Sequence, residues 1–351
     1  MARHLTFWAL SFNLLFFLFV GCTSHSAEKG NVPAGNKYAT GFQITPTDSG
    51  TVVEVFQPYQ RVCVREPMKR LGTMSTIQVG FLYALDAMEC LAAVCNSELI
   101  YTPVKGDEID LGDSMKPSAE RVLQANLDAL LAVNYGQYDN LEAARIEKLG
   151  VFTIYINEWQ EHSPLARAEW IRVIGALTGH LPQADSIFNQ VESKYISLSA
   201  KRSNSESSLT AKRSIMSGNN FRGTWYVPSG NNYLAYLFKD AGADYPFYDS
   251  ERETSIPLTI EETLHYFHDA DVWVGAGGNS LAELAELDEK HTWFKAYKEG
   301  RVYNWRKQRL PSGANNFWER GVVHPEEMLE DVIHILDNAP DSTLHFAKRL
   351  Y

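Results

Sequence analysis

Aromatic, amide and basic side chains gather in loops that follow the expected strands of this 351-residue chain. Ring faces supply flat apolar area, while amides and an arginine fix the orientation of a bound molecule. Such residues, spread over several loops, are typical of a site that binds a large, flat, partly apolar ligand. The candidate ligand-binding residues are Tyr101, Asn134, Tyr135, Trp159, Trp225, Trp305, Arg306, Asn316 and Trp318.

Two other kinds of site are alternatives. His265 and His268 lie three residues apart on an expected helix, a spacing at which two imidazoles can share a bare Zn or Mn ion. Ser114, Asp331 and His334 imitate the elements of a secreted GDS-type esterase. A serine nucleophile must be held rigidly at the end of a strand, beside its base. Because Ser114 follows a charged loop instead, we expect a binding protein with no catalysis and no cofactor of its own.

Two glutamates, Glu120 and Glu261, occupy matching positions in the two halves of the chain. The segments 118–123 and 259–264 align, and each glutamate stands two residues after a Ser or Thr at the start of an expected helix. One interpretation is helix capping, although a capping box needs a spacing of three. The other is a pair of exposed carboxylates offered to the arginines of a partner protein. Both interpretations stay open.

Short β-rich runs alternate with helical patterns along most of the chain. This alternation predicts an α/β fold with two lobes and mainly parallel sheets, whose ligands bind at the carboxyl ends of the strands. The expected strands include 91–94, 130–133, 151–156, 214–217, 225–227, 272–274 and 302–305.

The segment 181–205 is the longest expected helix. Its apolar residues recur at helical spacing along one face, and its opposite face is polar. A helix of about 24 residues is about 36 Å long, roughly the diameter of a small domain. We therefore expect a single rigid helix to join the two lobes. The apolar face consists of Ala184, Ile187, Phe188, Val191, Tyr195 and Leu198.

The N-terminus predicts export. Residues 7–20 form an apolar run that is short for a membrane span and follows a basic start, so residues 1–21 read as a signal peptide. The ending Val20-Gly21-Cys22 resembles the lipobox of bacterial lipoproteins, in which the cysteine is acylated. Residues 22–37 are rich in polar residues and Gly and read as a lipidated tether.

The length of the remaining chain favours two lobes, and its charge argues against a nucleic-acid partner. The 43 acidic and 32 basic residues give a formal charge of −11, with no basic stripe to neutralise phosphates. The expected parts are an N-terminal lobe at 38–164, a bridging helical segment at 165–205 and a C-terminal lobe at 206–351. Cys63, Cys90 and Cys95 have no zinc-site spacing, and small buried hydrophobes are as consistent with them as a disulfide.

Several of these elements, in this order, resemble the bacterial solute-binding lipoproteins of ABC importers for ferric siderophores, haem and cobalamin. They are the ST-x-x-x-x-F-L-x-A-L element from Ser75 to Leu85, the E-x-x-L helices at Glu120 and Glu261, the 181–205 helix and the final PEEMLEDVIHIL segment. The resemblance implies a monomer that captures an iron complex or corrinoid between two lobes. It also implies a periplasmic location on a lipid anchor, with Glu120 and Glu261 docked to the arginines of a permease dimer.

Overall fold

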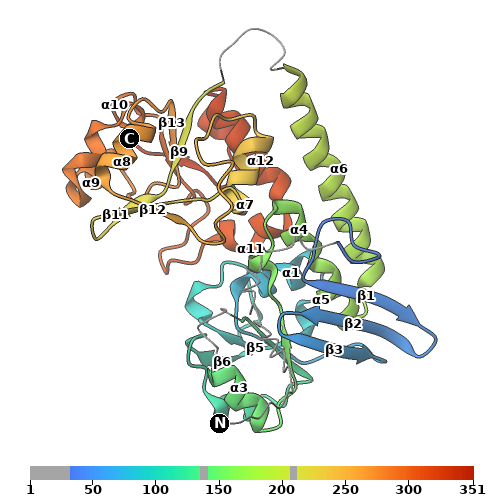
Figure 1. Cartoon of the computed structure of the whole chain (residues 1–351). Helices are drawn as coiled ribbons and strands as arrows, with labels where there is room; N and C mark the ends of the chain where they lie inside the picture. Colours follow the sequence, from blue (N-terminus) through green and yellow to red (C-terminus); the bar gives the residue numbers. More distant parts are fainter. Residues whose placement is uncertain (1–31, 135–140, 206–211) are drawn as a thin grey trace, which may run out of the picture. The chain divides into compact units, whose positions relative to one another are not determined.

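The first half of the chain folds around a five-stranded, all-parallel sheet in the order β6-β5-β4-β7-β8 (Figure 1). The computed structural model describes residues 32–134, 141–205 and 212–351, so residues 1–31, with Cys22, and Tyr135 lie outside it. The parallel sheet predicted from the alternation is confirmed. Its strands are β4 (Leu71–Thr73), β5 (Leu91–Cys95), β6 (Ile109–Gly112), β7 (Ala129–Ala132) and β8 (Thr153–Tyr155).

Helices cover both faces of this sheet, because successive strand residues point to opposite sides. Leu131 belongs to a core shared with α1 and α5, and the adjacent Leu130 belongs to a second core shared with α2 and α3. Ser75 caps α1 through a capping box with Gln78. The helices are α1 (Thr76–Ala84), α2 (Ala119–Gln124), α3 (Leu141–Lys148), α4 (Pro164–Glu169) and α5 (Ile171–Thr178).

An antiparallel meander, β1-β2-β3, precedes the parallel sheet. Two buried carboxylates hold the chain that enters it. Glu169 accepts hydrogen bonds from the amides of residues 37–39, and Glu161 accepts them from residues 40 and 41. Hydrogen-bonding the charged oxygens in this way offsets the cost of burying them. The strands are β1 (Phe42–Thr47), β2 (Gly50–Phe56) and β3 (Tyr59–Val64).

The second half contains two smaller sheets. In the first, ordered β15-β14-β13-β9, the strands β9, β13 and β14 are parallel and the edge strand β15 is antiparallel. The second is an antiparallel β10-β11-β12 sheet, so the expected strand at 225–227 pairs outside the parallel sheet. The strands are β9 (Ile215–Ser217), β10 (Asn219–Phe221), β11 (Thr224–Val227), β12 (Ile256–Leu258), β13 (Val272–Val274), β14 (Val302–Asn304) and β15 (Lys348–Arg349).

Six α-helices are described in the second half. None of the helices in the described part of the chain combines the length and apolar character needed to cross a membrane. The helices are α7 (Tyr233–Asp240), α8 (Ile260–Phe267), α9 (Leu281–Leu287), α10 (Lys295–Lys298), α11 (Asn316–Val323) and α12 (Pro325–Leu336).

The helix α6 (Leu181–Ser205) takes part in the cores of both halves (Figure 1). Ala184 and Phe188, near its start, pack into the core of the first half. Val191 and Tyr195, further along the same face, pack into the core of the second half. The structure therefore confirms two α/β lobes joined by one long helix, which we call the N-terminal and C-terminal lobes.

The lobes also touch through a contact that the sequence did not predict. Helix α11 of the C-terminal lobe packs against α1 of the N-terminal lobe, and its Val322 and Val323 lie in the N-terminal core. At the crossing, a Cβ added to Gly80 would lie 2.7 Å from the backbone oxygen of Glu319. Glycine is needed at this position because the two helix backbones approach too closely for a side chain.

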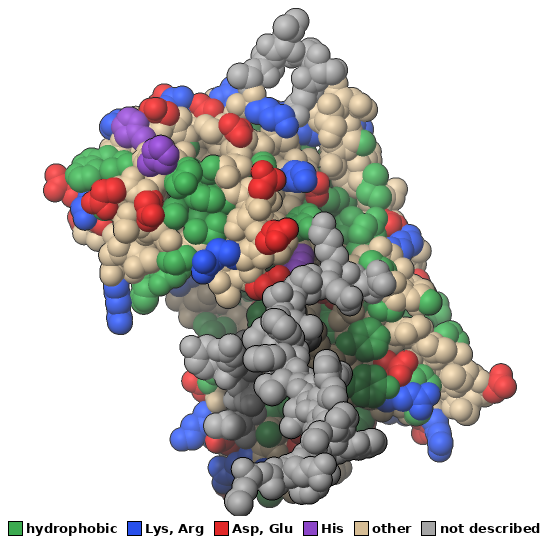
Figure 2. Space-filling view, viewed as in Figure 1, with side chains coloured by type: hydrophobic (Ala, Val, Ile, Leu, Met, Phe, Trp, Pro, Cys, Tyr) green, Lys and Arg blue, Asp and Glu red, His purple; other side chains and the backbone are tan. Residues whose placement is uncertain are grey.

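The surface mixes charges of both signs. Figure 2 shows acidic and basic side chains interspersed on the visible described face. Among the cysteines of the described residues, Cys90 and Cys95 are buried and Cys63 is exposed, and all three are free thiols. Burial raises the pKa of Cys95 to about 12, so this thiol behaves as a small apolar side chain.

Candidate ligand-binding site

The residues that follow the N-terminal strands are mostly occupied by hydrogen bonds within the lobe. The backbone N–H of Asn134, after β7, donates to Asn157 Oδ1 at 3.0 Å. The side-chain amide of Asn157, after β8, donates in turn to the carbonyl of Gln57 on the meander. Asn157 is 2% exposed. These amides therefore tie the sheet to the meander.

A buried ion pair lies just beyond them. Glu158 follows β8, and its Oε1 lies 3.7 Å from Arg167 Nη2 on α4. The guanidinium of Arg167 stacks over the ring of Tyr233, at the start of α7, with 4.3 Å to the ring centroid. Glu158 Oε2 and Arg167 Nε are buried with no hydrogen-bond partner among the described residues. Burial raises the pKa of Glu158 to about 7, although the Arg167 charge opposes this.

An aromatic group adjoins this ion pair on the C-terminal side. Trp305, after β14, stacks on Phe317 of α11 with 4.9 Å between centroids, and Trp318 meets Phe317 edge-on at 4.8 Å. Arg167, Phe317 and Trp318 line the same small cavity of about 10 Å³. Trp318 is 48% exposed, so one of its faces is available to a bound molecule.

A basic pocket of about 270 Å³ opens at the carboxyl end of β14. Three cationic side chains, Arg306, Arg309 and Lys348, line it together with Asn279 and Asn304, and no carboxylate is among its described lining residues. Arg306 Nη1 donates to Asn279 Oδ1 at 3.0 Å. Burial and the nearby positive charge of Arg309 lower the pKa of Arg306. The negative charge of Glu283, which does not line the pocket, opposes this shift in part. Three cations crowded around one pocket, of which Arg306 is partly buried, favour an anionic ligand.

A larger cavity of about 540 Å³ lies between α1, α6 and α11, and we call it the helix-lined cavity. Tyr101 and Asn316 both line it, so the structure brings these two predicted residues together. Their polar groups are partly in use: the N–H of Tyr101 donates to Glu319 Oε1 at 2.5 Å, and the Asn316 amide donates to Gln308 at 2.6 Å.

Trp225 requires a correction. It is 1% exposed and packs against Trp273 and Phe294 in the C-terminal core, and its indole N–H donates to the carbonyl of Ser217. It therefore fills the core and presents no face to a ligand. Trp159, by contrast, is 41% exposed after β8. Sequence reasoning missed Arg167 and Tyr233 as neighbours of this site, because they are distant in the chain and belong to different helices.

The family known as periplasmic binding protein matches residues 73–309 of the chain, from β4 to the basic pocket. The chain belongs to this family. An uncharacterised lipoprotein of Methanocaldococcus jannaschii is 27% identical over 288 residues, which is 78% of this chain. The chain spans 66% of the length of that relative.

Solved periplasmic binding proteins share the fold. A possible iron-binding solute-binding protein of Staphylococcus epidermidis superposes with a TM-score of 0.60 at 16% identity, covering 77% of this chain and 99% of that one. A periplasmic haem-binding protein of Pseudomonas aeruginosa gives 0.60 at 15% identity, covering 81% and 98%. A triscatecholate siderophore-binding protein of Bacillus subtilis, complexed with ferri-bacillibactin, gives 0.58 at 15% identity, covering 80% and 96%.

In this periplasmic binding protein the esterase alternative is wrong. The hydroxyl of Ser114 accepts a hydrogen bond from the Asn96 amide at 2.9 Å. The carboxylate of Asp331 accepts the backbone N–H groups of residues 345–347. Ser114 lies between β6 and α2 of the N-terminal lobe, whereas Asp331 and His334 lie on α12 of the C-terminal lobe. They therefore make no nucleophile–base–acid arrangement, in agreement with a family that binds solutes and is not enzymatic.

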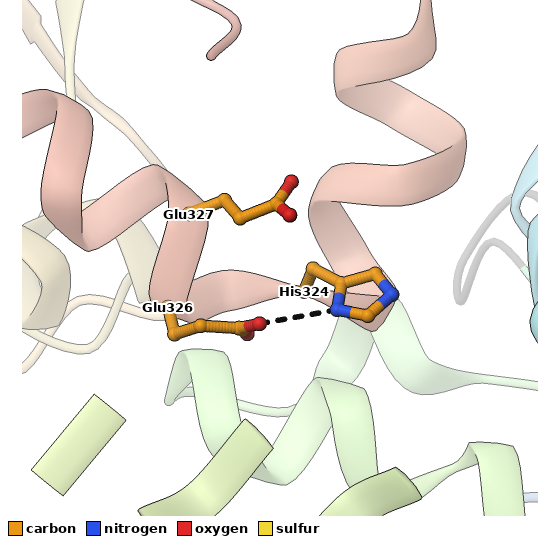
Figure 3. Close-up of side chains that lie close together, drawn as sticks. All are labelled: His324, Glu326 and Glu327. Carbon is orange, nitrogen blue, oxygen red and sulfur yellow. Dashed lines mark hydrogen bonds and ion pairs between the residues drawn. The ribbon is translucent and has the colours of Figure 1, made fainter. Parts of the chain in front are cut away.

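His265 and His268, the expected metal-binding pair, are not part of the cluster of possible metal ligands found in the described residues. His268 lies 2.8 Å from Asp269, and the His265 ring packs against Tyr266. Within the described ranges, the His, Cys, Asp and Glu donors that cluster closely enough for a shared ion are His324, Glu326 and Glu327 (Figure 3).

Glu120 and Glu261 occupy equivalent helix positions in the two lobes. Each is the second residue of its helix, α2 or α8, and each is exposed. Neither carboxylate makes a hydrogen bond or ion pair with another described residue. The capping box of α8 uses Glu262, whose side chain accepts the N–H of Thr259 at 2.8 Å.

Proposed function

We propose that the protein is the solute-binding component of an ABC importer for a ferric siderophore, haem or a corrinoid. The observation that carries the proposal is the basic pocket beside a partly exposed aromatic group, at the carboxyl ends of the C-terminal strands. Ligands of parallel α/β sheets bind at these ends. The fold relatives described above as iron-binding, haem-binding and siderophore-binding proteins support the same class of cargo.

The chemistry of the proposed contacts suits a metal chelate. Arg306 would pair with anionic groups of the cargo, and Trp305 and Trp318 would offer ring faces to its flat apolar parts. Trp159, which is 41% exposed, would contribute a ring face from the N-terminal lobe. Tyr101 and Asn316 line the separate helix-lined cavity, and we propose them as contacts of a cargo extension that reaches it.

The experiment is a titration of the purified full chain with haem, cobalamin and a panel of ferric siderophores. The cargo should bind with one-to-one stoichiometry, change its own absorption spectrum and quench tryptophan fluorescence. The matched test is Trp318→Ala against Trp293→Ala, because Trp293 is also exposed, at 42%, but ends the 3-10 helix Glu289–Trp293 and lines neither the basic pocket nor the small cavity beside Trp318. Loss of binding in both variants equally, or binding of none of the three classes, would contradict the proposal.

Delivery requires contact with the permease dimer. We assign this contact to Glu120 and Glu261, because both are exposed carboxylates at equivalent positions of the two lobes. Charge-assisted pairing with permease arginines would fix the orientation of a monomeric binding protein on its transporter. Size-exclusion chromatography with light scattering checks the monomer, and a stable dimer would rule out this mode of docking.

We further propose that Cys22 carries the lipid anchor. The tether expected at 22–37 would end near residue 34, because Arg172 and Glu169 bind the backbone of residues 35 and 37 to the N-terminal lobe. The Val20-Gly21-Cys22 sequence and the lipoprotein relative support a lipid-anchored location at a bacterial membrane, in the periplasm. One acyl chain binds a membrane only marginally, so retention needs several chains on the cysteine. Cys22→Ser should abolish partition into Triton X-114, and normal processing with unchanged partition would refute the anchor.

A further inference from the structure

His324, Glu326 and Glu327 meet where α11 turns into α12 (Figure 3). One donor atom from each side chain lies within 4.8 Å of the other two. The local sequence causes this arrangement: His324 stands at the corner, Pro325 begins α12, and the two glutamates follow in its first turn. Figure 3 shows the Glu327 carboxylate extending from α12 toward α11, with Glu326 beside the imidazole.

The carboxylate of Glu326 also indicates a bound ligand, because one of its buried oxygens has no partner among the described residues. It is 5% exposed, and its Oε1 lies 3.1 Å from His324 Nδ1. Its Oε2 is buried and has no hydrogen-bond partner among the described residues. A buried carboxylate oxygen without a donor is costly, and the nearby helix N-terminus offsets only part of that cost. A bound cation would satisfy this oxygen directly.

Glu327 is already oriented for the same purpose. Arg320 on α11 holds its two oxygens at 2.6 and 2.8 Å. Carboxylates that bind metals are commonly fixed by such outer hydrogen bonds, and each oxygen keeps a second lone pair for the ion. Arg320 therefore fits the role of a supporting partner, because a guanidinium cannot itself bind the cation.

We propose that His324, Glu326 and Glu327 bind one divalent transition-metal ion of the Zn²⁺ class. One imidazole with two carboxylates suits Zn²⁺ better than Mg²⁺ or Ca²⁺, which prefer oxygen alone. Bonds of about 2.0 to 2.2 Å place tetrahedral ligand atoms about 3.4 Å apart, so donors that now lie within 4.8 Å of one another need to close by up to about 1.4 Å. His324 and Arg320 line the helix-lined cavity, from which water completes the coordination.

The ion would pin the corner between α11 and α12. Because α11 packs against α1 across the lobes, this corner determines how the C-terminal lobe holds the N-terminal one. The site shares no lining residue with the basic pocket, and it borders the helix-lined cavity that we assign to an extension of the cargo. The proposal goes beyond the proposed transport function, and titration with Zn²⁺ in the absence of cargo tests it separately.

The test is calorimetric titration of the chelator-washed full chain, free of a polyhistidine tag, with Zn²⁺ alone. We expect one equivalent to bind and the melting temperature to rise with Zn²⁺ concentration. His324→Gln and Glu326→Gln should each weaken Zn²⁺ binding at least about 10-fold. His268→Gln is the matched control, because it removes another histidine that lies beside a carboxylate, and it should leave Zn²⁺ binding unchanged.

Each variant is first melted without metal, so that a folding defect is seen separately. If Glu326→Gln prevents folding, His324→Gln still decides the question, because His324 is only partly buried and contributes less to the core. No binding by the parent chain up to about 1 mM Zn²⁺, an affinity of only about −4 kcal/mol, would overturn the site. Equal binding by the parent and His324→Gln would also overturn it.

Discussion

In the N-terminal lobe the groups that follow the parallel strands serve the fold, whereas in the C-terminal lobe they include cations and rings that reach solvent. Asn157 is buried and hydrogen-bonded to the meander, and Glu158 is buried against Arg167. After β14, by contrast, Arg306 lines an open pocket. The two sheets have related topology at this end but different chemistry.

This difference teaches that one lobe can provide recognition while the other provides support. Crowded cations form strong charge-assisted hydrogen bonds with an anionic ligand, so the C-terminal lobe would bind the charged groups of the cargo. At the carboxyl ends of the N-terminal strands, which we call the supporting edge, the amides are hydrogen-bonded within the lobe, and Trp159 is the main exposed ring for a ligand. The corresponding end of the C-terminal strands is called the recognition edge.

The two lobes are alike at α2 and α8, where each has one exposed glutamate at the same helix position.

The largest expected effect tests whether the two equivalent glutamates share a docking role. Replacing Glu120 and Glu261 together by Ala should abolish reconstituted transport, because each lost carboxylate leaves permease arginines unpaired at a cost of about 2 kcal/mol or more. Cargo affinity and melting temperature should stay nearly unchanged, since exposed charges contribute little to folding. Replacement by Lys should be worse than Ala, because repulsion is added to the loss.

The adjacent Glu262 is the matched control for this prediction. Glu262→Ala removes the capping box of α8 and should lower the free energy of unfolding by about 1 kcal/mol, with transport intact. Thermal melting, cargo titration and transport are measured on the same preparations. Normal transport by the double Ala variant would show that the two lobes share a helix position without sharing a docking role.

The next effect tests the recognition edge. Arg306→Ala and Arg309→Ala should each weaken binding of an anionic cargo about 10- to 100-fold, because a hydrogen bond to a charged group is worth about 1.5 to 3 kcal/mol. Arg222→Ala, on the exposed β10–β11 turn, removes the same charge outside the pocket and should change affinity little. Equal losses in all three variants would mean that only overall charge matters, and the contrast between the edges would fail.

Local patterns were sufficient to predict the parallel sheets and α6. The apolar face of α6 repeats at helical spacing, and its residues divide between two cores in the order of the sequence. The place of Trp225 was also readable in principle. Strands alternate their faces, so Trp225 and Val227 point inward while Tyr226, 46% exposed, points outward. The interpretation of Trp225 as a ligand contact relied on residue type and ignored this alternation.

Tertiary contacts could not be predicted in the same way. Gly80 lies in an apolar helix, and no local pattern indicates that its missing side chain admits α11. Arg167 and Tyr233 are brought together only when α4 and α7 pack, so neither residue carries a signal near itself in the sequence. The same limit applies to Arg320, whose bond to Glu327 depends on the corner between α11 and α12.

A smaller effect probes the supporting edge through its buried Glu158. Its pKa is raised from 4.5 to about 7 in the folded protein, mainly by burial. The folded state therefore holds this proton while the unfolded state loses it, so stability is fully present below about pH 4.5 and falls as the pH rises toward 7. Relative to Glu158→Gln, the parent should lose up to about 3 kcal/mol over this window.

Urea unfolding of the parent and Glu158→Gln at several pH values measures this difference. Glu98→Gln, on an exposed turn, controls for the loss of one carboxylate. A parent that becomes more stable relative to Glu158→Gln as the pH rises from 4.5 to 7 would show that the Arg167 charge outweighs burial. The ion pair would then stabilise the N-terminal edge in its charged form.

The smallest expected effect concerns the place where the lobes meet. Gly80→Ala puts a Cβ 2.7 Å from the Glu319 backbone oxygen, which cannot move aside as a flexible side chain would. Overpacking of this kind costs about 1 to 3 kcal/mol, although alanine is the better helix former by about 1 kcal/mol. The free energy of unfolding should therefore fall. Gly321→Ala on α11 is the matched control, because its added Cβ would meet the flexible Met328 sulfur at 3.2 Å. Chemical denaturation measures the free energy of unfolding of both variants. Equal stability of the two would mean that α1 and α11 can separate without cost, so that α6 alone would join the N-terminal lobe to the C-terminal lobe.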